Sequence, residues 1–364
     1  MRHLFKDHVV RLRRLRTSLG RDLSGLRLDR NERVEPLPEA VVREMFARFR
    51  PEDLCAHPEV DDFYPLLARF LGVDQDCLYL VNGVTEGVRI ICDLLCRPGQ
   101  NVVALDPGYP MYRVNAELCG LTFRPWTYGA DLAPDMAALD AALDADTAVL
   151  LLANPNLPVE SCFGLDELAR LADRCAANGS ALVIDEAYHY FGAPSAIPLA
   201  LERDNVVVLR TFSKAFGLAS IRLGFMVSRP ENIEYLAKSR SLVESNTFSL
   251  GLASYMLEHP EIMRAHVASV AEGARVLTAG LDRLGVRHHG GRTTNGMLLF
   301  LAPGQDPAAL IAHLRARKIY VRGAFAAPFD TCVRVSIGAP QAMRTFLTEF
   351  EAWLARNGAA EGGV

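Results

Sequence analysis

The sequence contains no apolar run long enough to cross a membrane, and other absences narrow its function further. No stretch of its 364 residues approaches 18 consecutive apolar residues, so a membrane-spanning helix is not expected. The net charge is only −4, from 39 basic and 43 acidic side chains, which gives no sign of a nucleic-acid partner. The eight cysteines form no C-x-x-C pair and no zinc-like cluster with histidine. They are therefore expected to be reduced thiols in a cytoplasmic protein, and no metal site is predicted.

What the chain does contain is typical of a globular protein with room for two domains. Half of the residues are hydrophobic and 23% are charged. Seven arginines and lysines but only two acids occur in the first 22 residues, a bias that transit peptides share. This segment lacks serine enrichment, however, and Val9, Val10, Leu12 and Leu15 favour a short helix packed on its own protein. We find no internal repeat, and low complexity is confined to the tail at 358–364.

Short apolar runs alternate with helix-like stretches between residues 66 and 227. The runs predicted to be strands are 77–81, 102–105, 148–153, 181–184, 206–209 and 225–227. Helical periodicity over 165–177 ends at Asn178-Gly179, a helix stop. This alternation predicts an α/β fold with a mostly parallel sheet between helices. Ligands of such sheets bind at the carboxyl ends of the strands.

The second half of the chain has a different texture, which predicts a smaller α+β domain. It begins with a long helical pattern at 261–284. The remaining predicted elements are strands at 297–301, 319–322 and 332–337, and helices at 307–317 and from 341 onward.

A lysine with unusual neighbours follows the strand predicted at 206–209. Lys214 is flanked by Thr211 and Ser213, with Arg222 eight positions further on. Its amine can form a Schiff base with an aldehyde cofactor, while two hydroxyls and a guanidinium hold a phosphate. Arg210 and Arg222 are expected to raise the local positive potential and so lower the pKa of the amine. A solvated surface lysine is the alternative, and the buried strand before it argues against that interpretation.

Three further segments carry chemistry at the ends of predicted strands. Asp185 closes the strand of Ala181-Leu-Val-Ile-Asp-Glu-Ala-Tyr188, although an acid there can also simply cap a helix. The turn at Gly83 opens a helix, whose exposed N–H groups suit a phosphate. Arg334 alternates with valines in Cys332-Val-Arg-Val-Ser, where its planar fork suits a carboxylate better than lysine would.

Together these segments resemble the pyridoxal 5′-phosphate (PLP)-dependent aminotransferases of fold type I, in the class I/II group that includes histidinol-phosphate aminotransferases. The resemblance implies that Lys214 joins the cofactor as a Schiff base. It also implies that Asp185 keeps the pyridine nitrogen protonated and that Tyr188 hydrogen-bonds the 3′-oxygen. Further cofactor residues implied in the same way are Gly83, Val84, Thr85, Tyr109, Thr211, Ser213 and Arg222. Tyr109, in a Pro-x-Tyr-like loop, corresponds to the aromatic residue that stacks on the ring.

The resemblance also implies a domain division, an assembly and a set of substrate contacts. Residues 37–241 correspond to the large cofactor-binding domain, 242–364 to the small domain, and 1–36 to an arm that joins the small domain. The expected assembly is a homodimer with its active sites at the subunit interface. Arg334 corresponds to the arginine that grips the substrate α-carboxylate, and Arg322 to one that contacts distal groups.

The chain departs from the family pattern in the loop Asn154-Pro-Asn-Leu-Pro-Val-Glu160, where relatives have Asn-Pro-Asn-Asn-Pro-Thr-Gly. Leu157 replaces the asparagine that bonds the 3′-oxygen, so Asn156 or Tyr188 alone is left to hold that atom. Glu160, in place of glycine, adds a carboxylate that we place on the substrate side.

Two other departures concern the phosphate and the substrate. His57 replaces a tyrosine that reaches the phosphate of the neighbouring subunit's cofactor; either His57 serves that phosphate, or Tyr64 does, or the role is lost. Arg33 replaces the last asparagine of Leu-Asp-x-Asn-Glu-Asn, and the glycine- and tyrosine-rich stretch of histidinol-phosphate enzymes is missing after it. These differences argue against histidinol phosphate as the substrate. Arg33, Arg322 and Glu160 indicate a substrate with a polar distal end.

The sequence therefore predicts an aminotransferase that moves an amino group between an amino acid and a keto acid or related carbonyl compound. Another reaction on the same fold stays open, because the fold does not decide the chemistry: decarboxylation, elimination with cyclisation, or amino-acid oxidation. A cofactor-binding sensor without turnover is the remote alternative. Such sensors usually carry a DNA-binding module, and no spare domain is available for one here.

Overall fold

A seven-stranded sheet forms the centre of the computed structural model, which describes residues 2–12 and 22–357. The strand order is β2 (Leu78–Val81), β8 (Gly224–Val227), β7 (Val206–Thr211), β6 (Ala181–Asp185), β5 (Thr147–Ala153), β3 (Asn101–Leu105) and β4 (Thr122–Trp126). Only β8 runs against its neighbours; the β7–β6, β6–β5, β5–β3 and β3–β4 pairs are parallel. The predicted α/β fold with a mostly parallel sheet is confirmed.

Both faces of this sheet are buried, as the apolar runs predicted. Along β5, Leu150 and Leu152 pack into one hydrophobic cluster, while Val149 and Leu151 pack into another. Successive side chains of a strand point to opposite faces, so the two clusters are the two sides of one sheet. Fully burying each such side chain contributes roughly 1.5–3 kcal/mol.

Helices surround the sheet. They are α2 (Glu39–Phe46), α3 (Phe63–Leu71), α4 (Val84–Leu95), α5 (Met111–Leu118), α6 (Met136–Ala142), α7 (Leu165–Ala177), α8 (Ile197–Glu202), α9 (Pro230–Leu236) and α10 (Thr247–Glu258). Of these, α2 and α10 pack on other helices rather than on the strands of the sheet. Helix α7 ends at the predicted stop, where Gly179 takes the left-handed conformation at φ 73° that favours glycine. Among the described residues, no helix is both long and apolar enough to cross a membrane.

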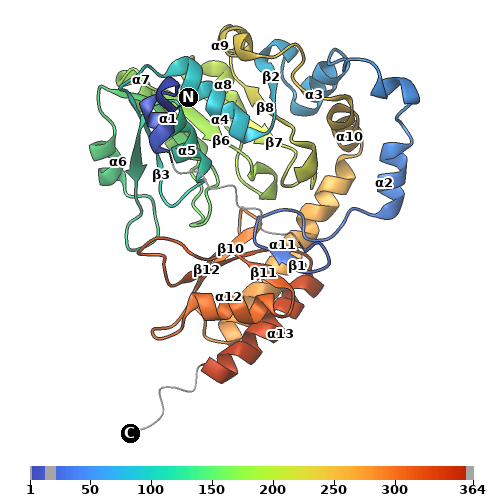
Figure 1. Cartoon of the computed structure of the whole chain (residues 1–364), viewed down its shortest axis with the longest axis vertical. Helices are drawn as coiled ribbons and strands as arrows, with labels where there is room; N and C mark the ends of the chain where they lie inside the picture. The colour runs from blue at the N-terminus through green and yellow to red at the C-terminus, as the bar shows by residue number, and fades with distance from the viewer. Residues whose placement is uncertain (1, 13–21, 358–364) are drawn as a thin grey trace.

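A smaller α+β domain lies below the large one, and α11 (Pro260–Arg283) runs down into it (Figure 1). Its antiparallel sheet has the order β12 (Cys332–Ser336), β10 (Gly296–Phe300) and β9 (His288–Gly290). The other helices are α12 (Pro307–Arg315) and α13 (Pro340–Asn357).

The N-terminal arm contacts both domains. Strand β1 (Leu26–Leu28) pairs in parallel with β11 (Ile319–Val321) of the small domain. The short helix α1 (Asp7–Arg11) contains Val9 and Val10 and contacts α5 of the large domain. Leu15 lies outside the described residues. The domain boundaries at 36 and 241 stay a prediction.

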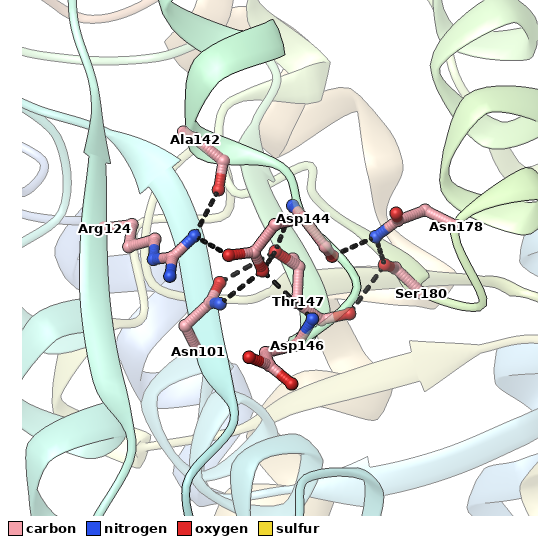
Figure 2. Close-up of polar contacts among 8 residues, drawn as sticks. All are labelled: Asn101, Arg124, Ala142, Asp144, Asp146, Thr147, Asn178 and Ser180. Carbon is pink, nitrogen blue, oxygen red and sulfur yellow. Dashed lines mark hydrogen bonds and ion pairs between the residues drawn. The ribbon is translucent and has the colours of Figure 1, made fainter.

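The amino edge of the sheet is held by a polar network around Asp144, the residue before the turn into β5 (Figure 2). Its carboxylate accepts hydrogen bonds from Asn101 Nδ2 at 2.9 Å and from the Asp146 N–H at 3.0 Å, and it pairs with Arg124. Hydrogen bonds led by that from Asn101 lower the pKa of Asp144 to about 2. The network joins the starts of β3, β4 and β5. The opposite, carboxyl edge is left free for the site described next.

Candidate active site

A cavity of about 160 Å³ lies at the carboxyl edge of the sheet, where the sequence placed the chemistry. Eleven of the predicted site residues line it: Val84, Thr85, Tyr109, Asn156, Asp185, Tyr188, Thr211, Ser213, Lys214, Arg222 and Arg334. They come from segments that are distant in the chain but follow neighbouring strands. The strand topology therefore accounts for their convergence.

One end of the cavity has groups of the kind that bind a phosphate. Arg222 Nη1 donates to Ser213 Oγ at 3.3 Å, and Thr211 Oγ1 donates to the same oxygen at 2.9 Å. Helix α4 begins at Val84, and the first N–H groups of a helix have no partner within it. A β-carbon on Gly83 would lie 2.9 Å from Arg222 Nη2, so glycine lets the guanidinium approach the turn. Gly83 also has a φ of 72°, which favours glycine.

A buried carboxylate lies at the floor of the cavity. Asp185 is 5% exposed, and it accepts hydrogen bonds from Tyr112 Oη at 2.7 Å and from the Ala187 N–H at 3.0 Å. Burial raises the pKa of Asp185 from 3.8 to about 6, although these hydrogen bonds and the charge of Lys214 act to lower it. A protonated ring nitrogen placed beside this carboxylate would compensate for its burial.

Tyr109 lines the cavity next to this carboxylate, and Tyr112 lies buried behind it. Tyr109 Oη lies 2.6 Å from Thr85 Oγ1, and its ring meets that of Tyr112 edge-on at 5.5 Å between centroids. Tyr109 is thus fixed through Thr85 at the start of α4. Tyr112 connects it to Asp185.

Lys214 also lines the cavity. Its Nζ donates to the backbone oxygens of Asn31 at 3.1 Å and Arg30 at 3.3 Å, and it lies 5.5 Å from the centre of the Tyr188 ring. Both carbonyls belong to the N-terminal arm, so the arm reaches the amine directly.

Arg210 does not contribute to this environment as the sequence suggested. Its side chain is 4% exposed and forms a 2.7 Å ion pair with Glu186. Thr211 lines the cavity, whereas the neighbouring Arg210 is not among the lining residues. The charge of Arg210 is therefore balanced within a separate buried cluster.

The altered loop has an unexpected arrangement. Asn156 Nδ2 faces three acceptors: the oxygens of Pro107 and Val159, each at 3.3 Å, and the Tyr128 hydroxyl. Leu157 lines the cavity but offers no polar atom. The Tyr188 hydroxyl accepts a hydrogen bond from Asn31 Nδ2 at 3.0 Å. Both hydrogens of the Asn156 amide group are thus used within the protein.

Arg334 lies on the small-domain side of the cavity. Its Nη2 donates to the Asp29 oxygen at 2.6 Å, and its buried Nε has no partner among the described residues. Its backbone pairs with that of Arg322, with N···O distances of 2.6 and 3.0 Å. Burial first, and then the charge of Arg322, lower the pKa of Arg334. An anionic group beside Arg334 would offset both the burial of its charge and the repulsion from Arg322.

Several other predicted residues lie outside the cavity lining. Arg322 is exposed beside Arg334, and His57 is exposed on a loop. Arg33 is half-buried, donating from Nε to the Glu35 oxygen at 3.1 Å. Glu160 turns toward the small domain, where Gly291, Arg292, Thr293 and Thr294 bind its carboxylate. The sequence interpretation of Glu160 as a substrate-side carboxylate is not reflected in this geometry.

Two residues that contact the site were missed by sequence reasoning. Tyr112 follows Tyr109 by three positions, the spacing that places two side chains on one side of a helical turn, so this signal was available. Asn31 belongs to a quoted motif, but its contacts with Tyr188 and Lys214 span more than 150 residues, and no local pattern reveals them.

The donor set fits a phosphorylated pyridine aldehyde. A guanidinium, two hydroxyls and a helix start gather at one end, a buried carboxylate lies at another, and an amine lies among them. The constriction at Gly83 and the unpartnered Arg334 Nε are features of the structure itself, independent of any resemblance.

Comparisons with known proteins agree with this chemistry. A profile of the family described as aminotransferase class I and II matches residues 25–350. Histidinol-phosphate aminotransferase of Chromobacterium violaceum is 30% identical over 332 residues, covering 90% of this chain and 91% of that protein. Histidinol-phosphate aminotransferase 1 of Burkholderia lata is 33% identical over 329 residues, covering 88% and 90%.

A solved structure has the same fold. Histidinol-phosphate aminotransferase from Sinorhizobium meliloti, in complex with pyridoxal 5′-phosphate, matches with a TM-score of 0.86 at 22% identity. The match covers 97% of this chain and 98% of that one. At this identity the likeness concerns the fold.

Proposed function

The chain belongs to the class I and II aminotransferases, and on this premise we propose that Lys214 carries out amino transfer in the cavity at the carboxyl edge of the sheet. The protein is a pyridoxal-phosphate-dependent aminotransferase of fold type I. The observation that most supports Lys214 is its position in one cavity with Arg222, Ser213 and Thr211, with the buried carboxylate of Asp185 and with Arg334. No other described lysine lines that cavity.

Bound pyridoxal phosphate supplies an aldehyde that takes up an amine, and a ring that accepts the electrons released at the substrate α-carbon. Arg222, Ser213 and Thr211, with the start of α4, would hold the phosphate. Asp185 would hold the proton on the ring nitrogen, because a paired positive charge compensates a buried carboxylate.

Lys214 would transfer the proton, and Arg334 would bind the substrate. Once the substrate amine has displaced it, Lys214 Nζ would be free to remove the proton from the substrate Cα and to deliver a proton to the aldehyde carbon of the cofactor, on the other side of the amine nitrogen. The hydrogen bonds from Lys214 to the Asn31 and Arg30 oxygens keep the amine near that path. Arg334 would bind the substrate carboxylate through its unpartnered Nε, which orients the Cα–H bond toward the lysine.

The proposed substrates are an α-amino acid and a keto acid or related carbonyl compound. The pair Arg334 and Arg322 supports an anionic substrate, and Arg322 is proposed to contact a distal polar group. Histidinol phosphate, which the names of the relatives contain, should also be tested. Arg33 was one argument against this substrate, but Arg33 does not line the cavity.

A homodimer with shared active sites is part of the same proposal. His57 is exposed and does not line the cavity of its own chain. Both features are expected of a residue that contacts the cofactor of a second copy. Tyr64, the alternative, accepts from the Leu80 N–H at 3.1 Å and contacts Glu244 within its own chain. A cytoplasmic location also stays a prediction.

The test is the absorbance spectrum of the purified protein with a panel of amino acids and, separately, with histidinol phosphate. We expect a cofactor band that Lys214→Ala removes and that Lys238→Ala, a lysine outside the cavity, leaves unchanged. We expect one amino donor to convert this band to that of the aminated cofactor, and the change should persist after the donor is removed. Addition of a keto acid should then restore the original band. Release of CO2 or ammonia without this reversible change would favour the decarboxylase or lyase alternative. No band after addition of pyridoxal phosphate would refute the proposal.

A further inference from the structure

Asn31 joins the N-terminal arm to both the catalytic lysine and the tyrosine beside it. The residue is 2% exposed and has a φ of 54°, a left-handed conformation that few residues other than glycine, asparagine and aspartate adopt readily. Its backbone oxygen accepts from Lys214 Nζ at 3.1 Å, and its Nδ2 donates to Tyr188 Oη at 3.0 Å. The burial, the backbone conformation and the two contacts indicate that Asn31 has a role beyond linking two segments of the chain.

The amide of Asn31 is oriented by the small domain. The backbone N–H of Asn31 donates to Ser336 Oγ at 2.8 Å, so the Ser336 hydroxyl hydrogen is free to be donated onward. It is donated to Asn31 Oδ1, also at 2.8 Å. With Oδ1 engaged as an acceptor, Nδ2 is the end of the amide that faces Tyr188.

This orientation sets the direction of the Tyr188 hydrogen bond. A hydroxyl that accepts a hydrogen bond from Nδ2 keeps its own hydrogen for another acceptor. The described residues provide no acceptor for it, and Tyr188 lines the cavity. The hydrogen of Tyr188 is therefore available to an oxygen inside the cavity.

Tyr188 is the only donor that the altered loop leaves for such an oxygen. Leu157 has no polar side-chain atom, and the Asn156 amide hydrogens are used by the oxygens of Pro107, Val159 and Tyr128. Where two donors are expected from the family pattern, one is present.

We propose that Asn31 is a positioning residue that fixes Tyr188 as the single hydrogen-bond donor to the cofactor's ring oxygen, in a site where Leu157 offers none. This inference rests on the proposed function. Asn31 acts through Tyr188 and through the place it gives Lys214. Ser336 in turn holds Asn31.

The test is a double-mutant cycle read from the pH midpoint of the bound cofactor's absorbance change, without substrate. Asn31→Asp keeps the left-handed backbone and the contact to Ser336, but its carboxylate accepts the Tyr188 hydrogen. A donor to the ring oxygen stabilises its negative form, so losing that donor raises the midpoint. We expect a rise of roughly one pH unit or more, since a hydrogen bond to a charged group is being lost.

The same substitution is then made in a Tyr188→Phe background. There the Asn31→Asp shift should be smaller by roughly one unit, because no hydrogen is left to redirect. Asn31→Gly, which suits the positive φ and keeps the backbone oxygen, should give a smaller rise that also disappears in the Tyr188→Phe background. Cofactor dissociation rates, measured on the same proteins, should follow the same pattern.

Equal Asn31→Asp shifts in the wild-type and Tyr188→Phe backgrounds would mean that the added carboxylate acts only through its field, and would overturn the inference. A Tyr188→Phe midpoint equal to that of the wild type would also overturn it. Failure of the proposed function is distinguishable, because the wild type itself would then show no cofactor band.

Discussion

The carboxylate of Glu160 links the altered loop of the large domain to the small domain, and removing it should weaken the fold measurably. It accepts from the N–H groups of Gly291 and Arg292 at 3.1 Å and of Thr293 at 3.3 Å. It also accepts from Thr294 Oγ1 at 2.6 Å. The residue is 9% exposed.

The expected loss can be worked from these contacts. Glu160→Ala removes the acceptor from four donors, and a buried donor left unsatisfied costs about 1–3 kcal/mol. Water entering the vacated space recovers part of this cost, so we expect the free energy of unfolding to fall by about 2–4 kcal/mol. Glu160→Gln keeps the shape but turns an NH2 group toward backbone N–H groups. The free energy of unfolding of Glu160→Gln should therefore fall by roughly 1–2 kcal/mol.

The chain offers its own probes for this measurement. Its two tryptophans are Trp126 in β4 of the large domain and Trp353 in α13 of the small domain, and both are buried. Urea unfolding of cofactor-saturated protein, followed by Trp353 fluorescence in a Trp126→Phe background, reports on the small domain. The reverse background, Trp353→Phe, reports on the large one. We expect the Glu160 variants to shift the small-domain transition most.

The control is Glu234→Ala, which removes an exposed glutamate from α9 of the large domain. Surface substitutions of this kind usually change stability by less than about 0.5 kcal/mol. If Glu160→Ala were as mild as Glu234→Ala under both probes, the reasoning from four donors on one carboxylate would be refuted.

Two further predictions concern the cofactor site. In cofactor-free protein, burial raises the pKa of Asp185 from 3.8 to about 6, so the stability linked to this group is complete below pH 3.8 and is lost as the pH rises through 6. Asp185→Asn should therefore stabilise the cofactor-free protein at pH 7.5 by ~3 kcal/mol more than at pH 4. The measurement is the difference in free energy of unfolding between the variant and the wild type, from urea unfolding at each pH. A difference that does not depend on pH would contradict the raised pKa of Asp185. His57→Ala should weaken pyridoxal phosphate binding by about 2- to 10-fold, measured by equilibrium dialysis, because one hydrogen bond to the phosphate is lost. Unchanged affinity would show that His57 has no phosphate role.

The sequence was most informative where local patterns decide the structure. Apolar runs bounded by turn residues predicted six strands of the large sheet. The chemistry at their ends then placed Asp185 and Lys214 in one cavity. Strand β4 was not predicted, because Thr122-Phe-Arg-Pro-Trp126 is a half-exposed edge strand with a proline and only its last residue is buried.

Tertiary partners were what the sequence could not supply. Arg210 was interpreted from its closeness to Lys214 in the chain, but it pairs with Glu186, the residue that follows the neighbouring strand β6. Glu160 binds mainly backbone N–H groups, which every residue but proline carries and no side-chain pattern can mark. Contacts made through the backbone at long range are therefore the part of a site that sequence reasoning loses.

The two departures in the altered loop have a common physical consequence. Leu157 gives up a polar contact to the cofactor, and its Cδ1 lies 3.0 Å from where a β-carbon on Gly296 would be, so it packs on β10 of the small domain. Three residues later, Glu160 binds the turn between β9 and β10. The loop thus lines the cavity with Asn156 and Leu157 and also contacts the domain that carries Arg334. Since Asn31 also binds Ser336 in β12, the cofactor side and the arginine side of the cavity are held together before any substrate arrives. Side chains held by such contacts lose less conformational freedom when a ligand binds than free side chains would.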